Sequence, residues 1–249
     1  MRILLVSDLH YALPQLDWVI GAGPSYDLVV VAGDILNIRS PVPLEAQSEV
    51  ALQYLSRLQS ETGLVVASGN HDLTGPDRAG EQSALWLGDA RAAGIPTDGS
   101  SLTVGDVLVT ICPWWDGPVG RGAVAAQLAG DAVHRPRWWL WDYHWPPLGS
   151  PTCWTGRRDY GDADLRQWLG EYGPDMVLAG HVHQSPFRPD GAWADRIGPT
   201  WVFNPGNQIG PVPTHVEIDL DAGWARWSSL LGVEQVDLAA AETPARTVF

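Results

Sequence analysis

Short apolar runs, each followed within a few residues by a polar one, recur along the chain. They cover residues 3–6, 28–32, 64–67 and 176–179. Continuous apolar runs of this length predict strands that are buried on both faces, because such a run offers water no polar face. The polar residues that follow these runs are Asp8, Asp34, Asn70 and His181.

Between these strands, apolar residues recur at the spacing of an amphipathic helix. The segments are 43–61, 83–93 and 162–171, and each ends close to a glycine, at position 63, 94 or 173. Two hairpins are also predicted, one joining 102–104 to 107–111 and one joining 216–220 to 225–228. Strands that alternate with helices indicate an α/β fold with substantial parallel pairing.

A chain of 249 residues without repeats or linker-like segments is most simply one domain spanning 1–249. The apolar pattern weakens after Leu231, so we expect residues 232–249 to form a tail packed over the body or over a neighbouring subunit. The sequence leaves the oligomeric state open.

The net charge of −14 argues against a protein that grips extended nucleic acid, because phosphate binding needs a basic surface. Small anionic substrates remain open, since bound metal ions reverse the local field. Cys112 and Cys153 are expected as free thiols in a reducing compartment. No apolar run has the length of a signal peptide or membrane span, so we expect no membrane partner and a cytoplasmic location.

Residues able to bind metal follow the apolar runs, where ligands of open α/β sheets bind beyond the carboxyl ends of strands. Asp8 and His10, like His181 and His183, have the alternate spacing that lets both side chains of an extended segment point the same way. Mixed oxygen and nitrogen donors suit a pair of divalent transition ions better than one closed structural zinc. The candidate ligands are Asp8, His10, Asp34, Asn70, His144, His181 and His183.

Each of these short motifs is weak by itself. A lone histidine such as His144 is more often a structural residue than a ligand. The specificity comes from the combination, in which a glycine also precedes Asp34, Asn70 and His181.

The motifs occur in the order Asp-x-His, Gly-Asp, Gly-Asn-His-Asp, His-x-Pro-Pro and Gly-His-x-His, between Asp8 and His183. This order resembles the calcineurin-like metallophosphoesterase superfamily. Asn204-Pro205-Gly206 is similar to a turn that follows the last motif in many bacterial members. The resemblance implies a two-sheet α/β sandwich flanked by helices, with a dinuclear metal site at one edge.

The resemblance also implies two ligand sets that share a bridging Asp34. Metal one takes Asp8, His10, Asp34 and His183, and metal two takes Asp34, Asn70, His144 and His181. Manganese, iron and zinc all remain open as the two divalent ions. We hypothesise that His71 stabilises or protonates the leaving oxygen, and that Asp72 either orients His71 or caps the following turn.

Departures from the superfamily's larger branches narrow the expected function. Asn37 stands where serine/threonine protein phosphatases carry an acidic residue and purple acid phosphatases a ligand tyrosine. We therefore expect a small bacterial phosphoesterase, favoured as a phosphodiesterase acting on a small nucleotide-like substrate. A phosphomonoesterase of broad specificity is the alternative within this chemistry, and a non-catalytic binding module is the alternative outside it.

The chain also contains 14 tryptophans, several of them near the candidate ligands in sequence. If residues 138–145 are extended, Trp139, Trp141, Tyr143 and Trp145 share one face. One interpretation is that these rings fill the core, and that nearby arginines are solvated. The other is that some of these side chains contact a flat, phosphorylated substrate. The candidates for such contacts are Trp114, Trp115, Trp145, Arg157 and Arg158.

Overall fold

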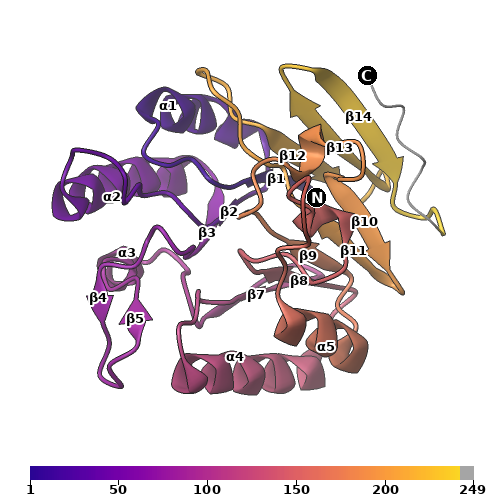
Figure 1. Ribbon diagram of the computed structural model, residues 1–249, viewed down its shortest axis with the longest axis horizontal. Coiled ribbons are helices and arrows are strands. Elements are labelled where there is room, and N and C mark those ends of the chain that lie inside the picture. The colour runs from indigo at the N-terminus through magenta and orange to yellow at the C-terminus, as the bar shows by residue number, and fades with distance from the viewer. Residues whose placement is uncertain (242–249) are drawn as a thin grey trace.

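The computed structural model describes residues 1–241, and two six-stranded sheets form its centre (Figure 1). The first sheet has the order β14-β13-β12-β1-β2-β3. Its strands are β1 (Arg2–Val6), β2 (Leu28–Ala32), β3 (Gly63–Ala67), β12 (His215–Asp219), β13 (Trp224–Ser229) and β14 (Gly232–Asp237). Strands β1, β2 and β3 pair in parallel, whereas β12, β13 and β14 continue the sheet in antiparallel pairing.

The second sheet has the order β10-β11-β9-β8-β7-β6. Its strands are β6 (Ser101–Val104), β7 (Val107–Ile111), β8 (Trp138–Asp142), β9 (Met176–Leu178), β10 (Ala194–Ile197) and β11 (Thr200–Phe203). The inner four strands are parallel, and each edge strand is antiparallel to its neighbour. A separate two-stranded hairpin is formed by β4 (Gly75–Pro76) and β5 (Gln82–Ser83).

Helices cover the outer faces of both sheets (Figure 1). The first sheet is covered by α1 (Leu13–Ala22), α2 (Leu44–Glu61) and α3 (Leu87–Ala92). The second is covered by α4 (Pro118–Asp131) and α5 (Ala163–Tyr172). Short 3-10 turns complete the chain at η1 (Gly23–Ser25), η2 (Ala132–His134), η3 (Pro151–Cys153) and η4 (Ser185–Phe187).

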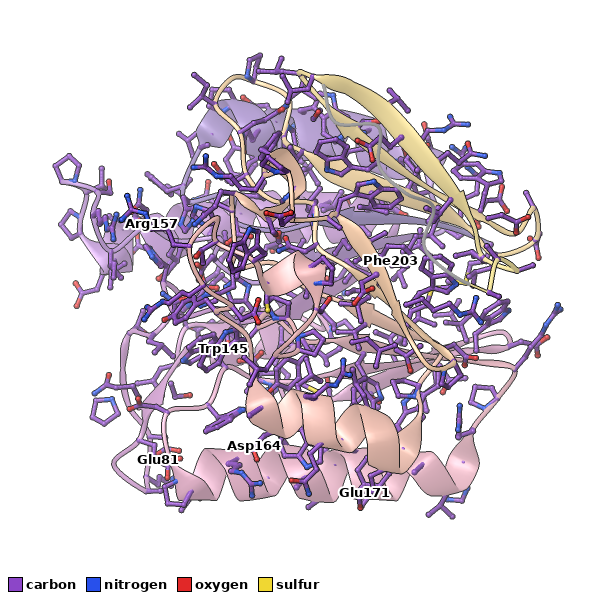
Figure 2. The ribbon with its side chains drawn as sticks, turned by 45° about the vertical axis from the view of Figure 1, so that its right-hand side comes forward. Glu81, Trp145, Arg157, Asp164, Glu171 and Phe203 are labelled. Atoms are coloured by element: carbon purple, nitrogen blue, oxygen red, sulfur yellow. The ribbon has the colours of Figure 1, made fainter. Side chains whose placement is uncertain are left out.

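Period-two alternation divides each parallel strand between two cores. In β1, Ile3 packs in the core between the sheets, whereas Leu4 packs under the helices. In β8, Leu140 packs between the sheets, whereas Trp139 and Trp141 pack under α4 and α5. Phe203 of β11, near the middle of Figure 2, belongs to the core between the sheets. The two-sheet sandwich flanked by helices is therefore confirmed. The shared face predicted for 138–145 holds for Trp139 and Trp141, because the strand ends at Asp142.

Both hairpins are confirmed, and the four predicted apolar runs form β1, β2, β3 and β9. Three other segments differ from the sequence prediction. The helix expected at 83–93 is shorter, because Gln82–Ser83 pairs as β5 with Gly75–Pro76. Helix α4 was not predicted, because it buries only Val124 and Leu128 and so shows little apolar periodicity. Residues 232–237, expected as a tail, form β14, because the edge of β13 offers backbone hydrogen bonds. Residues 242–249 of that expected tail lie outside the described residues.

Two further predictions concern the whole chain. Cys112 and Cys153 are both buried free thiols, as expected. Within residues 1–241, no helix combines the length and apolar character needed to cross a membrane.

Candidate metal centre

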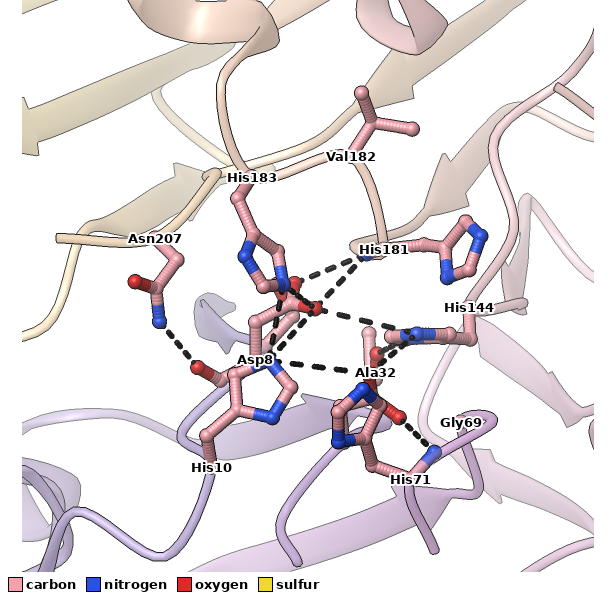
Figure 3. A network of polar contacts seen from close by, with 12 residues as sticks. Asp8, His10, Ala32, Gly69, His71, His144, His181, Val182, His183 and Asn207 are labelled. Atoms are coloured by element: carbon pink, nitrogen blue, oxygen red, sulfur yellow. Dashed lines mark hydrogen bonds and ion pairs between the residues drawn. The ribbon is translucent and has the colours of Figure 1, made fainter. Parts of the chain in front are cut away.

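Six of the seven candidate ligands meet at the edge of the sandwich where the parallel strands end (Figure 3). One cluster contains Asp8, His10, Asp34 and His183, and a second contains Asp34, His144 and His181. Within each cluster, one donor atom from every residue lies within 4.8 Å of all the others. The clusters share Asp34, which is the residue expected to bridge two ions.

Asn70 enters this arrangement through the loop after β3. The backbone N–H of the next residue, His71, donates a hydrogen bond to Asp34 Oδ1 at 2.7 Å. Asn70 Oδ1 is buried and has no hydrogen-bond partner in the described structure. An unpaired buried amide oxygen next to the shared carboxylate is what a missing metal partner would leave behind.

Strained backbone places four of the ligands. Asp8, His10, Asp34 and His181 have φ values of 55°, 45°, 55° and 66°, in the left-handed region that side chains other than glycine rarely adopt. Among residues 1–241 only one other non-glycine residue, Tyr11, does so. Backbone hydrogen bonds hold the turns, including Asp8 N–H to Gly33 O at 3.0 Å and His10 N–H to Asp34 O at 2.9 Å.

The glycines that precede the ligands provide room for other ligands. A Cβ atom on Gly69 would lie 2.2 Å from Asp34 Oδ1, and one on Gly180 would lie 2.6 Å from Asp8 Oδ2. Both distances are well inside van der Waals contact. The glycines in the sequence motifs therefore mark close approach between strand ends that are far apart in the chain.

The two carboxylates are buried but held in their ionised form. Burial alone would raise the pKa of Asp8, yet the neighbouring rings of His183, His144 and His10 bring it well below its ordinary value. For Asp34 the same opposition, with His144 as the main positive neighbour, also lowers the pKa. Asp8 further accepts hydrogen bonds from the hydroxyl of Ser7 at 2.7 Å and the backbone N–H of His181 at 3.0 Å. Ionised carboxylates in this position are ready to bind cations.

His144 is oriented by the end of strand β2. Its Nδ1 lies 2.6 Å from the carbonyl oxygen of Ala32, and a carbonyl can only accept, so Nδ1 carries the proton. Nε2 then faces Asp34 Oδ2 at 3.4 Å. Burial lowers the pKa of His144, but the carboxylates of Asp34 and Asp8 outweigh it and raise that pKa to about 10, so a metal ion bound at Nε2 would displace a proton. A backbone carbonyl that fixes the tautomer in this way is the usual support of a metal-binding histidine.

The other histidines show the same readiness for a metal. Burial and the neighbouring His144 lower the pKa of His181 to about 3, and its Nε2 has no hydrogen-bond partner among residues 1–241. On the other side, His10 Nε2 and His183 Nε2 lie 2.9 Å apart, and His183 Nε2 is 3.0 Å from Asp8 Oδ1. Nitrogen lone pairs that converge beside carboxylates fit divalent transition metals.

His71 borders this centre without belonging to either cluster. Its ring meets the ring of His10 edge-on, with centroids 4.5 Å apart. Burial lowers the pKa of His71 below its ordinary value, and this outweighs the attraction of Asp34. The neutral imidazole therefore prevails at neutral pH, and it can donate one hydrogen bond.

The prediction that Asp72 is a catalytic residue orienting His71 is wrong in the described structure. Asp72 is buried, and its carboxylate accepts the backbone N–H groups of Asp34 at 2.7 Å, Leu36 at 2.9 Å and Gly69 at 2.8 Å. Nδ1 of His71 is buried and has no hydrogen-bond partner. Asp72 thus holds two ligand loops together, which neither alternative anticipated, because the amides that it accepts precede it in the chain.

The predicted substrate contacts divide into two groups. Trp114 lies beside His181, with ring centroids 5.1 Å apart, and Trp145 lies 5.5 Å from the same ring. Trp115 instead packs in the core under α4 and α5, where its Nε1 donates to the hydroxyl of Tyr143 at 2.8 Å. The prediction that Trp115 contacts the substrate is therefore corrected, because its ring packs towards the helices.

The two arginines follow on an exposed loop. The guanidinium of Arg158 lies over the ring of Tyr160 at 5.3 Å. Arg157 is exposed at the periphery of the molecule (Figure 2). Tyr160, whose ring stacks on His181 at 5.1 Å and 27°, was missed by the sequence reasoning. It lies in a loop without a motif, and no sequence signal marks it.

Two asparagines that follow β11 support the loops of the candidate ligands. Asn204 is buried, and its Nδ2 donates to the carbonyl oxygens of Thr152 at 3.0 Å and Val182 at 3.1 Å. Asn207 Nδ2 donates to the carbonyl oxygen of Asp8 at 2.5 Å. The Asn-Pro-Gly turn found in the sequence therefore fixes the loop between His181 and His183.

An α/β sandwich with paired aspartate and histidine clusters at its sheet edge suits metal-dependent hydrolysis. The sequence model of the family described as calcineurin-like phosphoesterase matches residues 1–185, and the chain belongs to this family. It is accordingly a hydrolase that acts on phosphoester bonds and depends on metal.

Several solved structures are similar to this chain. A hypothetical protein from Thermus thermophilus is 15% identical, with 95% of this chain and 99% of that chain covered and a TM-score of 0.50. Yfce, a phosphoesterase from E. coli, is 15% identical over 96% of this chain and 100% of its own, with a TM-score of 0.47. A metallophosphoesterase from Sphaerobacter thermophilus is 17% identical over 89% of this chain and 84% of its own, with a TM-score of 0.40. Comparison with curated proteins found no match.

Proposed function

We propose that the protein hydrolyses a small, nucleotide-like phosphodiester at a centre of two divalent ions. The observation that supports this most directly is the pair of clusters sharing Asp34, together with the partnerless Asn70 Oδ1 and His181 Nε2. Metal one would be held by Asp8, His10, Asp34 and His183, and metal two by Asp34, Asn70, His144 and His181. When bound, two such ions supply a nucleophile at neutral pH and neutralise charge on the phosphoryl group.

The residues of the chain would divide the remaining work. Ionised Asp8 and Asp34 provide the negative charge that holds the ions, and Ala32 O keeps His144 in the tautomer that presents Nε2. His71, neutral because of its burial, would donate a ring N–H to the oxygen of the departing alcohol. Asp72 would only position the ligand loops, by accepting hydrogen bonds from the backbone N–H groups of Asp34 and Gly69.

The finer choices rest on the surroundings of the centre. Aromatic side chains at His181 favour a substrate with a flat group over a bare phosphomonoester. We propose manganese as the ion to supply first. Iron and zinc are the alternatives, because mixed imidazole and carboxylate sites accept all three. The charge of −14 speaks against extended nucleic acid. The two free thiols fit work in a reducing compartment such as the cytoplasm.

The test compares bis(p-nitrophenyl) phosphate with p-nitrophenyl phosphate on protein loaded with manganese, and then with iron and zinc. We expect kcat/KM to be higher for the diester, and we expect Asp34→Asn to lose both activities because it weakens both sites. Faster turnover of the monoester would favour a phosphomonoesterase. Two bound ions per chain without hydrolysis of any ester would favour a binding module.

A further inference from the structure

Three aromatic side chains gather on the metal-two side of the centre. The rings of Trp114 and Trp145 stack on each other at 5.2 Å and 21°. Trp114 also lies 5.8 Å from the ring of His144, and Tyr160 stacks on His181 at 5.1 Å. We call Trp114, Trp145 and Tyr160 the aromatic wall. Its members come from the loops after β7 and β8, so it borders the strand ends that deliver His144 and His181.

The candidate hydrogen-bond donor to the leaving group lies elsewhere. The ring of His71 packs on that of His10, a metal-one ligand, at 4.5 Å. Figure 3 shows the His71 ring beside His10, whereas the ring of His181 points away from both. A phosphate held at this centre therefore meets two different surroundings, His71 on one side and the aromatic wall on the other.

The wall is fixed in place before any substrate binds. The backbone N–H of Trp114 donates to the hydroxyl of Ser68 at 2.9 Å, next to the Asn70 loop. The indole N–H of Trp145 donates to the carbonyl oxygen of Tyr160 at 3.1 Å. Tyr160 nevertheless remains 41% exposed, so the wall is open to solvent. Pre-organised flat rings bind a flat group at little cost in conformational entropy.

Positive charge collects beside the wall in an otherwise acidic protein. Arg157 and Arg158 belong to the loop that carries Tyr160, and the guanidinium of Arg158 lies over its ring. Arg188 packs against the same loop, since a Cβ on Gly156 would lie 3.2 Å from its Cδ. With a net charge of −14 on the whole chain, the Arg158 guanidinium over Tyr160 and Arg188 against the same loop bring cations to the wall, although Asp159 lies in that loop too.

We propose that the aromatic wall binds the group that stays on phosphorus, and that this group is a flat ring such as the base of a nucleoside 5′-phosphate. The inference rests on the proposed phosphodiesterase function. The substrate is then a diester of a nucleoside 5′-phosphate whose second alcohol departs on the His71 side. The oxygen of water bonds to phosphorus, the bond to the departing oxygen breaks, and a proton from the water ends on that oxygen. The products are the nucleoside monophosphate and the free alcohol.

A binding experiment tests the wall without catalysis. Calorimetry on the manganese-loaded protein compares adenosine 5′-monophosphate with ribose 5-phosphate, which lacks only the base. Stacking on aromatic side chains predicts that the nucleotide binds about 10-fold or more tightly. Trp145→Leu and Tyr160→Leu should bring this ratio towards one. Trp224→Leu is the matched control, because Trp224 lies on β13 and stacks with Arg226 at 4.6 Å, and it should keep the wild-type ratio.

A kinetic experiment uses two diesters with the same leaving group, the p-nitrophenyl esters of thymidine 5′-phosphate and of ethyl phosphate. The wild type should favour the thymidine ester in kcat/KM about 10-fold, and Trp145→Leu should abolish most of this preference. Equal turnover of both diesters, or an unchanged preference in Trp145→Leu and Tyr160→Leu, would overturn the inference while leaving the diesterase function intact. Hydrolysis of p-nitrophenyl phosphate alone would overturn the proposed function itself.

Discussion

At the scale of single residues, His71 separates metal binding from catalysis. It is outside both ligand clusters, yet it touches the ring of His10 and its backbone N–H holds Asp34. Replacing the ring leaves that backbone bond in place. A role in catalysis is therefore testable without dismantling the centre.

We expect His71→Ala to lower kcat on bis(p-nitrophenyl) phosphate by about 10²–10⁴-fold, the usual size of a positioned proton donor's contribution. Metal content, measured by atomic emission, should stay at two ions per chain. Asn70→Ala is the neighbouring control, and it should lose metal two. Wild-type turnover in His71→Ala would contradict the role of His71 as donor to the leaving oxygen. Loss of metal in this variant would make His71 a structural residue.

Residue types and spacing predicted which candidate ligands come together, because each short motif lies at a strand end and strand ends meet. They predicted side-chain partners less well. Asp72 looked like a partner of its neighbour His71, but its carboxylate reaches backbone amides of two other loops. Trp114 and Trp115 are adjacent in sequence and face different surroundings, His181 and the helical core. Adjacent positions do not reveal which way a loop turns its side chains.

At the scale of elements, Asp98 links the loop after α3 to the end of β3. Its Oδ1 accepts the backbone N–H of Ser68 at 2.8 Å, and the hydroxyl of Ser68 accepts Trp114 N–H. Burial raises the pKa of Asp98 from 3.8 to about 6, against the opposing hydrogen bonds from Ser68. The ionised carboxylate therefore costs stability in the folded state.

This raised pKa predicts how the Asp98→Asn substitution changes the free energy of unfolding with pH. Because the folded protein binds the Asp98 proton more tightly than the unfolded chain does, the cost of ionisation is absent below about pH 4 and complete above about pH 6. The variant should therefore be more stable than the wild type by about 1–3 kcal/mol near pH 8, and equal to it near pH 4. Urea unfolding across this range measures the difference. Asp106→Asn, at an exposed turn, is the control, and a difference independent of pH would contradict the prediction.

Elements with a strong apolar pattern, either a continuous run or a helical spacing, were predicted from the sequence. Elements with a weak apolar pattern were not. The runs that became β2 and β3 are buried along almost their whole length, so their composition is decisive. Helix α4 and strand β14 have few buried residues, and each depends on a neighbour that is already formed. Their stability comes from tertiary contact, which local pattern does not record.

At the scale of the whole molecule, metal binding should stabilise the fold. The centre joins strand ends from both sheets, and it keeps two carboxylates and four histidine rings close together. Ions bound there would bridge the sandwich. A ligand that binds only the folded state adds to the free energy of unfolding by mass action.

Adding Mn²⁺ to chelator-treated protein should therefore raise Tm. At a free concentration of about 100 times Kd the gain is about 2.7 kcal/mol, or about 5–10 °C for a chain of this size. Scanning calorimetry measures the shift. The rise should shrink in Asp34→Asn, which weakens both sites, and persist in Asp106→Asn. A Tm that does not respond to any of manganese, iron or zinc would contradict a resident metal centre.

The sequence by itself determined the class of fold, the family and the set of candidate ligands. Buried parallel strands need continuous apolar runs, and metal ligands need particular donor atoms at the ends of those runs, so both leave local traces. Only the tertiary structure decided that Asp72 is a scaffold, that Trp115 faces the core and that Tyr160 stacks on His181. These depend on distances between segments far apart in the chain, and such distances are set by how the two sheets pack.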